Sequence, residues 1–165
     1  MNQQQKTNIG LVEYCKAQLG RPYWYGCFGQ ISTQTLLDYK ERQYPKYYTD
    51  TDFDDQMGVK VHDCIGLIKG YMWCKDPEDP KPQYATNGFK DLSANGYLRH
   101  AKTKGAIATM PDIPGVLVFM PGHVGVYIGD GEVIEARGHK FGVVKTKLKN
   151  RKWVNWAMVD EIQYL

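Results

Sequence analysis

The chain has 165 residues, of which 42% are hydrophobic and 24% charged, and its formal net charge is +3. This length fits one domain of common size with a substantial hydrophobic core, so we expect a single domain over residues 1–165. No uninterrupted apolar run approaches the roughly 18 residues of a membrane span, and the charge falls short of the footprint of a nucleic-acid-binding protein. Composition therefore argues against a membrane or a nucleic acid as a partner.

The N-terminal stretch MNQQQKTNIG lacks an apolar signal-peptide core, so we expect no classical export signal in this chain. No CxxC pair occurs among the four cysteines, Cys15, Cys27, Cys64 and Cys74. A zinc ribbon is therefore not predicted, and we expect mostly free thiols. A metal site built from Cys64, His62 and His123 would lack a diagnostic spacing, and we predict neither a metal nor a cofactor.

Two helices are predicted in the first quarter of the chain. Residues 8–19 place apolar side chains at helical spacing, with Asn8 as the N-cap and Gly20 as the stop. Residues 32–43 have a short amphipathic pattern that opens at Ser32. The aromatic, glycine-punctuated stretch RPYWYGCFGQ between them is expected to be a loop.

The middle of the chain passes from a polar stretch to an apolar one. Residues 46–60 are polar and acidic and predict a surface loop, whereas residues 63–74, DCIGLIKGYMWC, are apolar on nearly every helical face, as in a central buried helix. After Pro114 the periodicity changes to two, which predicts strands over residues 115–120, 123–129, 132–138, 142–148 and 153–162. Helices followed by an antiparallel sheet of about five strands indicate an α+β domain.

Cys64 stands at the first turn of the predicted buried helix. The unpaired N–H groups and partial positive charge of a helix terminus favour a thiolate and can hold an oxyanion. A lone cysteine is more often a buried small hydrophobe, but Asp63 and His62 make this helix start polar, and His123 opens a strand downstream. A nucleophilic cysteine needs such a histidine and a polar group that orients the imidazole. His62 and His100 themselves are expected at the surface.

The hairpin GHVGVYIGDGEVIEA decides whether Glu135 can orient His123. A two-residue loop at 130–131 would place Glu135 on the opposite face of the sheet. A three-residue loop at 129–131 would pair Gly125 with Glu135 and set Glu135 diagonally beside His123, with Cα atoms about 7–8 Å apart. The turn residues fit either loop. Burial favours the second, because the first would strand a carboxylate among apolar side chains.

Three segments of the chain, taken in order, resemble motifs of the NlpC/P60 cysteine peptidases, which have a papain-like fold. They read GRPYWYGC at 20–27, DCIGL at 63–67 and GHVGVYIGDGEVIEA at 122–136. The resemblance spans roughly residues 8–162. Residues 27–62, with their own helix, exceed the usual short connection, and we expect this insertion to form a wall of the cleft. The resemblance implies hydrolysis of peptidoglycan stem peptides, typically between γ-D-glutamate and a diamino acid, and action at the cell wall or elsewhere outside the cell.

The resemblance also implies roles for individual residues. Cys64 is the nucleophile and His123 the general base, while Glu135 stands where the family usually has a histidine and would orient His123. His139, beyond the end of the strand, is the rival for that third role. The residues implied in binding the oxyanion or shaping the substrate pocket are Tyr23, Asp63 and Tyr25.

Two departures from the family pattern keep other functions open. Ile65 replaces the usual serine after the cysteine, and Glu135 replaces the usual histidine. One alternative is a catalytically silent wall-binding or effector module, which would bind the wall without creating new amino termini. Another is a papain-like amidase or acyltransferase, which would keep the nucleophile but act on lipid or protein amides.

Overall fold

The computed structural model describes residues 5–49 and 52–165. Its α-helices are α1 Asn8–Ala17, α2 Gln34–Gln43, α3 Cys64–Trp73 and α4 Ala94–His100. Its strands are β1 Phe28–Ile31, β2 Lys60–His62, β3 Lys104–Ala106, β4 Leu117–Met120, β5 His123–Gly129, β6 Glu132–Ala136, β7 Val143–Lys147 and β8 Asn155–Ala157. Short 3-10 helices lie at Pro45–Tyr47, Asp54–Gln56, Thr86–Gly88, Ile107–Thr109 and Leu148–Asn150. No helix in the described ranges is long and apolar enough to cross a membrane.

The first two helices form where the sequence predicts them, but each cap is one residue away from the expected one, earlier for α1 and later for α2. Thr7, and not Asn8, caps α1 with its hydroxyl, while the buried Asn8 side chain donates to the carbonyl of Pro114 over 2.8 Å. Likewise Thr33 caps α2. The expected cap Ser32 is buried and donates its hydroxyl hydrogen to neighbouring carbonyls. In both cases the side chain expected as the cap instead forms a hydrogen bond to a residue distant in sequence.

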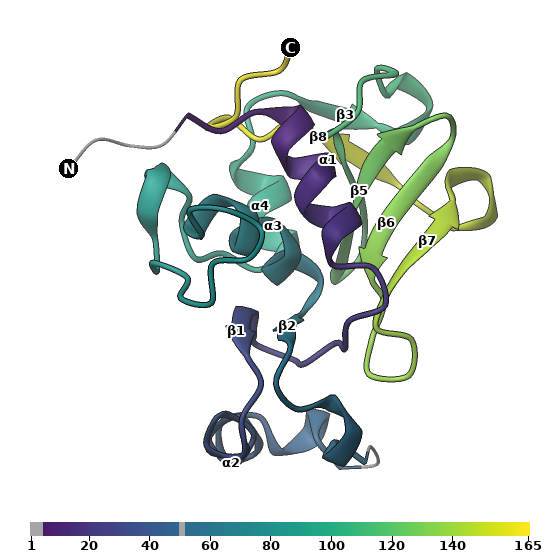
Figure 1. Ribbon diagram of the computed structural model, residues 1–165. Coiled ribbons are helices and arrows are strands. Elements are labelled where there is room, and N and C mark those ends of the chain that lie inside the picture. The colour runs from purple at the N-terminus through teal and green to yellow at the C-terminus, as the bar shows by residue number, and fades with distance from the viewer. Residues whose placement is uncertain (1–4, 50–51) are drawn as a thin grey trace.

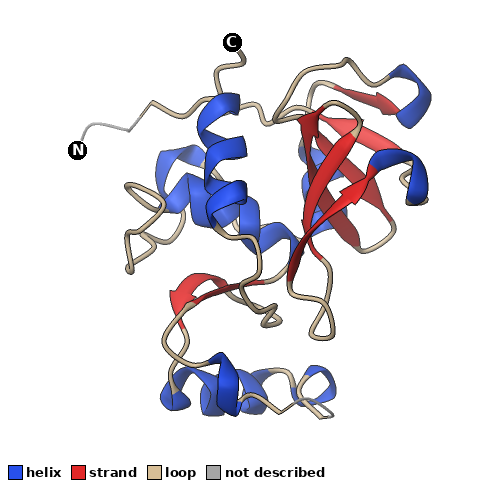
Figure 2. Cartoon of the chain, turned by 45° about the vertical axis from the view of Figure 1, so that its right-hand side comes forward, coloured by secondary structure: helices blue, strands red, loops and turns tan. Residues whose placement is uncertain are grey.

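The sheet confirms the predicted α+β class. Its six strands follow the order β3-β8-β4-β5-β6-β7. The five expected strands correspond to β4 through β8; β5 has the predicted bounds and the other four are shorter. The sheet curls beside α1, α3 and α4, as Figures 1 and 2 show. Three strands and one helix were not predicted: β3, the antiparallel pair β1-β2, and α4. Each is short, so its hydrophobic period is too brief to detect.

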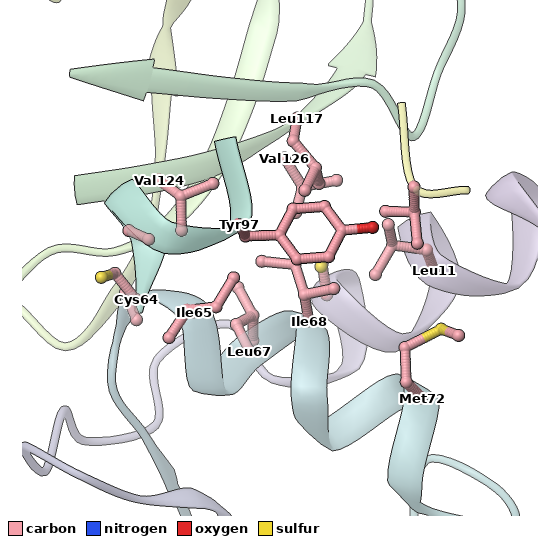
Figure 3. Packing of buried hydrophobic residues seen from close by; sticks show 14 of the residues in the cluster. Leu11, Cys64, Ile65, Leu67, Ile68, Met72, Tyr97, Leu117, Val124 and Val126 are labelled. Carbon is pink, nitrogen blue, oxygen red and sulfur yellow. The ribbon is translucent and has the colours of Figure 1, made fainter. Parts of the chain in front are cut away.

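Helix α3 lies at the centre of the main core, as its apolar sequence predicts. Leu67 and Ile68 are fully buried against residues of α1, α4 and the sheet (Figure 3). A glycine at position 66 makes the close approach possible, because a Cβ there would lie 1.9 Å from the carbonyl oxygen of Cys27. The helix can therefore press its first turn against the loop that precedes β1. All four cysteines are buried free thiols.

The segment between β1 and β2 corrects the prediction of a surface loop over residues 46–60. Tyr48 and Phe53 are buried in a small second core with Trp24 and Leu37. Figure 2 shows this part, with α2 and short helical turns, set apart from the six-stranded sheet; the β1-β2 pair joins it to the rest of the chain. The aromatic residues in an otherwise polar stretch supply the apolar surface that folds it. Residues 50 and 51 of the predicted loop, like residues 1–4 at the N-terminus, lie outside the described part.

Candidate active site

Cys64 is the first residue of α3, directly after its cap. The Asp63 carboxylate accepts a hydrogen bond from the Gly66 N–H over 2.7 Å, which caps the helix, and another from the Gly26 N–H over 3.0 Å. Asp63 therefore ties the start of α3 to the predicted loop at 20–27. The cap leaves the other N–H groups of the first turn directed at the thiol.

The Cys64 thiol is nearly buried, and this corrects the expectation of a favoured thiolate. Burial raises the pKa of Cys64 to about 12, and the Asp63 charge raises it further, against the opposing effect of backbone N–H groups that include that of Val124. The helix terminus thus acts as expected but is outweighed by desolvation. The resting thiol is neutral, and its contact with the Val124 N–H places it beside the start of β5.

His123, the first residue of β5, is held on two sides. Its Nε2 lies 2.8 Å from Oε1 of Glu135, and its ring stacks on Trp153 at 5.6 Å between centroids with an interplanar angle of 14°. An ionised carboxylate can only accept, so Nε2 carries the proton. In the neutral ring the lone pair is then on Nδ1, the nitrogen that a general base needs to have available. No hydrogen bond between the His123 ring and the Cys64 sulfur is present in the described residues.

The β5-β6 register confirms that Glu135 shares a face with His123. Val126 pairs with Ile134 and Tyr127 with Val133, which puts Gly125 opposite Glu135. A Cβ on Gly125 would lie 2.7 Å from Val133 and 3.3 Å from the Cβ of Glu135, so the glycine makes room for the carboxylate.

The form of the turn differs from the predicted three-residue loop. Gly129 pairs with Glu132, and Asp130 and Gly131 form a two-residue turn with φ values of 53° and 72°. An irregularity between Tyr127 and Gly129 adds the residue that shifts the register. Asp-Gly thus adopts its preferred tight turn, while a bulge in β5 keeps the carboxylate away from the apolar face.

Glu135 is fully buried and accepts four hydrogen bonds. Besides His123, its partners are the Thr146 hydroxyl at 2.6 Å and the Arg151 guanidinium, through Nε at 3.0 Å and Nη2 at 2.7 Å. Burial by itself would raise the pKa of Glu135, but the hydrogen bonds from His123, Arg151 and Thr146 outweigh it and lower the pKa to about 2. The carboxylate is therefore ionised, and the Arg151 charge balances it.

Sequence reasoning missed Arg151 and Thr146, because neither belongs to a motif: Thr146 lies in the predicted strand 142–148 and Arg151 between two predicted strands. The period of two in β7 carries a signal for Thr146: Thr146 pairs with Val133, which is on the face of Glu135. Arg151 follows a 3-10 helix after β7, where no periodicity specifies direction. Only the folded chain shows that it reaches Glu135.

The three predicted pocket residues, Tyr23, Tyr25 and Asp63, line one cleft together with Cys64. The cleft has a volume of about 970 Å³, and α2 contributes to its wall. Burial raises the pKa of the Tyr23 hydroxyl well above its ordinary range, so it is a neutral donor. Tyr25 stacks face to face on Tyr47 at 3.8 Å.

Two further histidines make contacts different from those of His123. His139, the rival for the third position, packs its ring edge-on against Tyr23 at 5.1 Å, and its nitrogens have no hydrogen-bond partner among the described residues. His62 corrects a prediction, because it is fully buried and not at the surface. Its Nε2 lies 2.7 Å from the Tyr14 hydroxyl, and burial, with the nearby Lys60 charge, lowers its pKa to about 3. Within the described ranges, no three His, Cys, Asp or Glu side chains gather as a metal site.

The sequence profile of the NlpC/P60 family matches residues 20–161, a range that includes all three motif segments. The chain belongs to the NlpC/P60 family. No functionally curated protein sequence matches it. The matched range includes the start of α3 and the β5-β6 hairpin.

Solved structures share the fold of this NlpC/P60 chain at low identity. NlpC2 from Trichomonas vaginalis is 15% identical with a TM-score of 0.57, over 96% of this chain and 48% of that one. The peptidoglycan hydrolase RipB from Mycobacterium tuberculosis is 19% identical with a TM-score of 0.52, over 95% and 65%. The chain thus spans less than two thirds of these two. For the P60 domain of an M. avium subspecies paratuberculosis antigen the identity is 19%, the TM-score 0.53, and the coverage 95% and 96%.

Proposed function

We propose that this NlpC/P60 protein is a peptidoglycan hydrolase, a cysteine endopeptidase that cleaves stem peptides between γ-D-glutamate and the diamino acid. The observation that carries the proposal is the 2.8 Å bond between His123 Nε2 and the ionised Glu135. It fixes the imidazole tautomer that can accept a proton at Nδ1, next to the helix start that presents Cys64. The cell wall is then its place of action.

The proposed reaction begins when His123 removes the proton of the neutral Cys64 thiol as substrate engages. The sulfur attacks the scissile carbonyl, and the Cys64 N–H, assisted by the neutral Tyr23 hydroxyl, stabilises the oxyanion. His123 then gives the proton to the leaving amine, and a thioester forms. Water, activated by the same imidazole, releases the glutamyl product and regenerates the thiol.

Glu135 acts through His123 in this scheme. As His123 becomes an imidazolium, the buried carboxylate at 2.8 Å stabilises the new charge. Arg151 already balances that carboxylate, so the imidazolium is not locked in a fully desolvated ion pair of its own. RipB and SagA, two peptidoglycan hydrolases of similar fold, support the proposed substrate.

The test is mass spectrometry of purified muropeptides incubated with the protein and with Cys64→Ala. We expect new amino termini on the diamino acid with the unaltered protein and none with the variant. Cleavage that survives Cys64→Ala would contradict the nucleophile. Binding of the wall without new termini would favour the silent module, and turnover confined to lipid or protein amides would favour the amidase or acyltransferase.

A further inference from the structure

Helix α2 places a buried ammonium group in the wall of the cleft. Lys40 is only 6% exposed, yet it lines the same cavity as Cys64. Its Nζ donates to the Gly26 carbonyl over 2.9 Å and to the Gln43 side chain over 3.2 Å. An ammonium has three N–H groups, so one remains for another acceptor.

No carboxylate in the described residues forms an ion pair with Lys40. The second lysine that lines the cavity, Lys69, is different, because its Nζ lies 2.6 Å from Asp91. Asp63 lines the cavity too, but its two oxygens accept from backbone N–H groups. Burying a charge without a partner is costly, and the rings of Tyr39 and Tyr44, both 5.6 Å from Nζ, offset only part of that cost.

Lys40 is linked through one hydrogen-bonded residue to the start of α3. Gly26 accepts from Lys40 with its carbonyl and donates to Asp63 with its N–H. Thus a single residue connects the ammonium to the cap that precedes Cys64. A γ-linked glutamyl residue keeps its α-carboxylate free, and a short aliphatic chain joins that carboxylate to the carbonyl that Cys64 would attack.

We propose that Lys40 binds the free α-carboxylate of the γ-glutamyl residue, which makes the α2 wall a specificity determinant. The inference rests on the proposed function, because it assigns a group of that substrate to this wall. The bound carboxylate completes the third hydrogen bond of the ammonium and neutralises its charge. Lys40 comes from the inserted segment, so the specificity is a property of this chain's own wall.

The experiment compares two synthetic stem peptides that differ only in this group, L-Ala-γ-D-Glu-diamino acid-D-Ala and its α-carboxamide. We expect the unaltered protein to prefer the carboxylate in kcat/KM by about 10- to 100-fold, the usual value of a hydrogen bond to a charged group. Lys40→Gln keeps a donor for Gly26 but removes the charge, and should abolish most of the preference by slowing only the carboxylate peptide.

Lys46→Gln is the matched control, because it removes the same charge from an exposed position just after α2 that does not line the cavity. It should keep the preference. Equal loss on both peptides in Lys40→Gln would show that Lys40 only clamps Gly26 and would overturn the inference, as would the absence of a preference in the unaltered protein. Thermal unfolding of each variant separates these results from misfolding.

A binding measurement separates failure of this inference from failure of the proposed function. If neither peptide is cleaved, the endopeptidase proposal fails, and calorimetry with the same two peptides still tests Lys40. Binding that requires the carboxylate and is lost in Lys40→Gln would support the inference without catalysis. Equal binding of both peptides, or none, would overturn it.

Discussion

The two sides of the candidate active site manage charge in opposite ways. On the sheet side, Glu135 is ionised and fully buried, and four hydrogen bonds from His123, Thr146 and Arg151 hold it. On the helix side, burial keeps the Cys64 thiol neutral at the start of α3. A buried carboxylate persists only when its oxygens are bonded and its charge is balanced, whereas a neutral thiol needs no partner.

This difference indicates which half of the site is prepared before substrate binds. The sheet side fixes the tautomer and orientation of His123 at the cost of burying an ion pair. The helix side keeps its N–H groups for charge that develops during the reaction. Under the proposed function, the proton of Cys64 would pass to His123 only in the complex with substrate. The following experiments test this contrast.

Glu135→Gln should have the largest effect, because it removes the charge at the centre of the sheet side. Arg151, whose side chain is 20% exposed, would then be a mostly buried cation without its partner, and we expect the free energy of unfolding to fall by about 3–5 kcal/mol. Loss of the imidazole's carboxylate should also lower kcat/KM by about 10²-fold. Urea unfolding and hydrolysis of a stem peptide measure the two effects.

The double variant Glu135→Gln, Arg151→Met is the control for this prediction. Removing both charges should restore part of the lost stability but none of the activity, because His123 still lacks its partner. A single Glu135→Gln variant as stable and active as the unaltered protein would remove the basis for calling the sheet side prepared.

The helix side makes a prediction about chemical reactivity. Because burial raises the pKa of Cys64 to about 12, the thiolate fraction at neutral pH is small. The rate of iodoacetamide alkylation at Cys64 should therefore rise about tenfold per pH unit between pH 7 and 9, or about 100-fold in all. Peptide mass spectrometry follows the site. A fast rate that is constant between pH 5 and 8 would instead indicate a resting thiolate–imidazolium pair.

The sequence predicted the sheet side better than the helix side. Side chains alternate between the two faces along β5 and β6, and a carboxylate buried among apolar side chains is costly. These two facts were enough to place Glu135 beside His123. The same local reasoning could not supply the bulge that creates this register, since Asp130-Gly131 is compatible with more than one turn. Arg151 was out of reach because its contact depends on the path of the chain after β7.

Predictions failed where distant parts of the chain decide the outcome. The helix-terminus effect on Cys64 is local and was foreseen, but its desolvation arises from packing against β5. His62 has polar neighbours in sequence, yet β2 carries it into the interior beside Tyr14. Tyr48 and Phe53 are a second case. The polar composition around them predicts a surface loop, but both pack in one cluster with Trp24.

His62 extends the helix-side contrast to acid stability. Its pKa of about 3 in the folded chain lies below the ordinary 6.5, so the unfolded chain binds the extra proton first. The contribution of His62 to the free energy of unfolding is fully present above pH 6.5. It is lost as the pH falls towards 3, by up to about 1.4 kcal/mol per pH unit. His62→Gln can keep the hydrogen bond to Tyr14 without titrating. It should flatten the stability curve between pH 6.5 and 5, measured by urea unfolding, and an unchanged slope would assign the loss to other groups.

Thr146→Val should have the smallest effect and tests how far the sheet side tolerates a lost bond. The substitution keeps the shape of the side chain but removes the 2.6 Å donor to Oε2 of Glu135, which Arg151 still contacts through Nε. We expect the free energy of unfolding to fall by about 1–2 kcal/mol, the value of one hydrogen bond to a charged group. Because His123 bonds the other oxygen, the pH profile of kcat/KM should keep its shape. A profile displaced by a full pH unit would mean that Thr146 helps set the charge on Glu135, and that His123 senses the whole network and not the carboxylate alone.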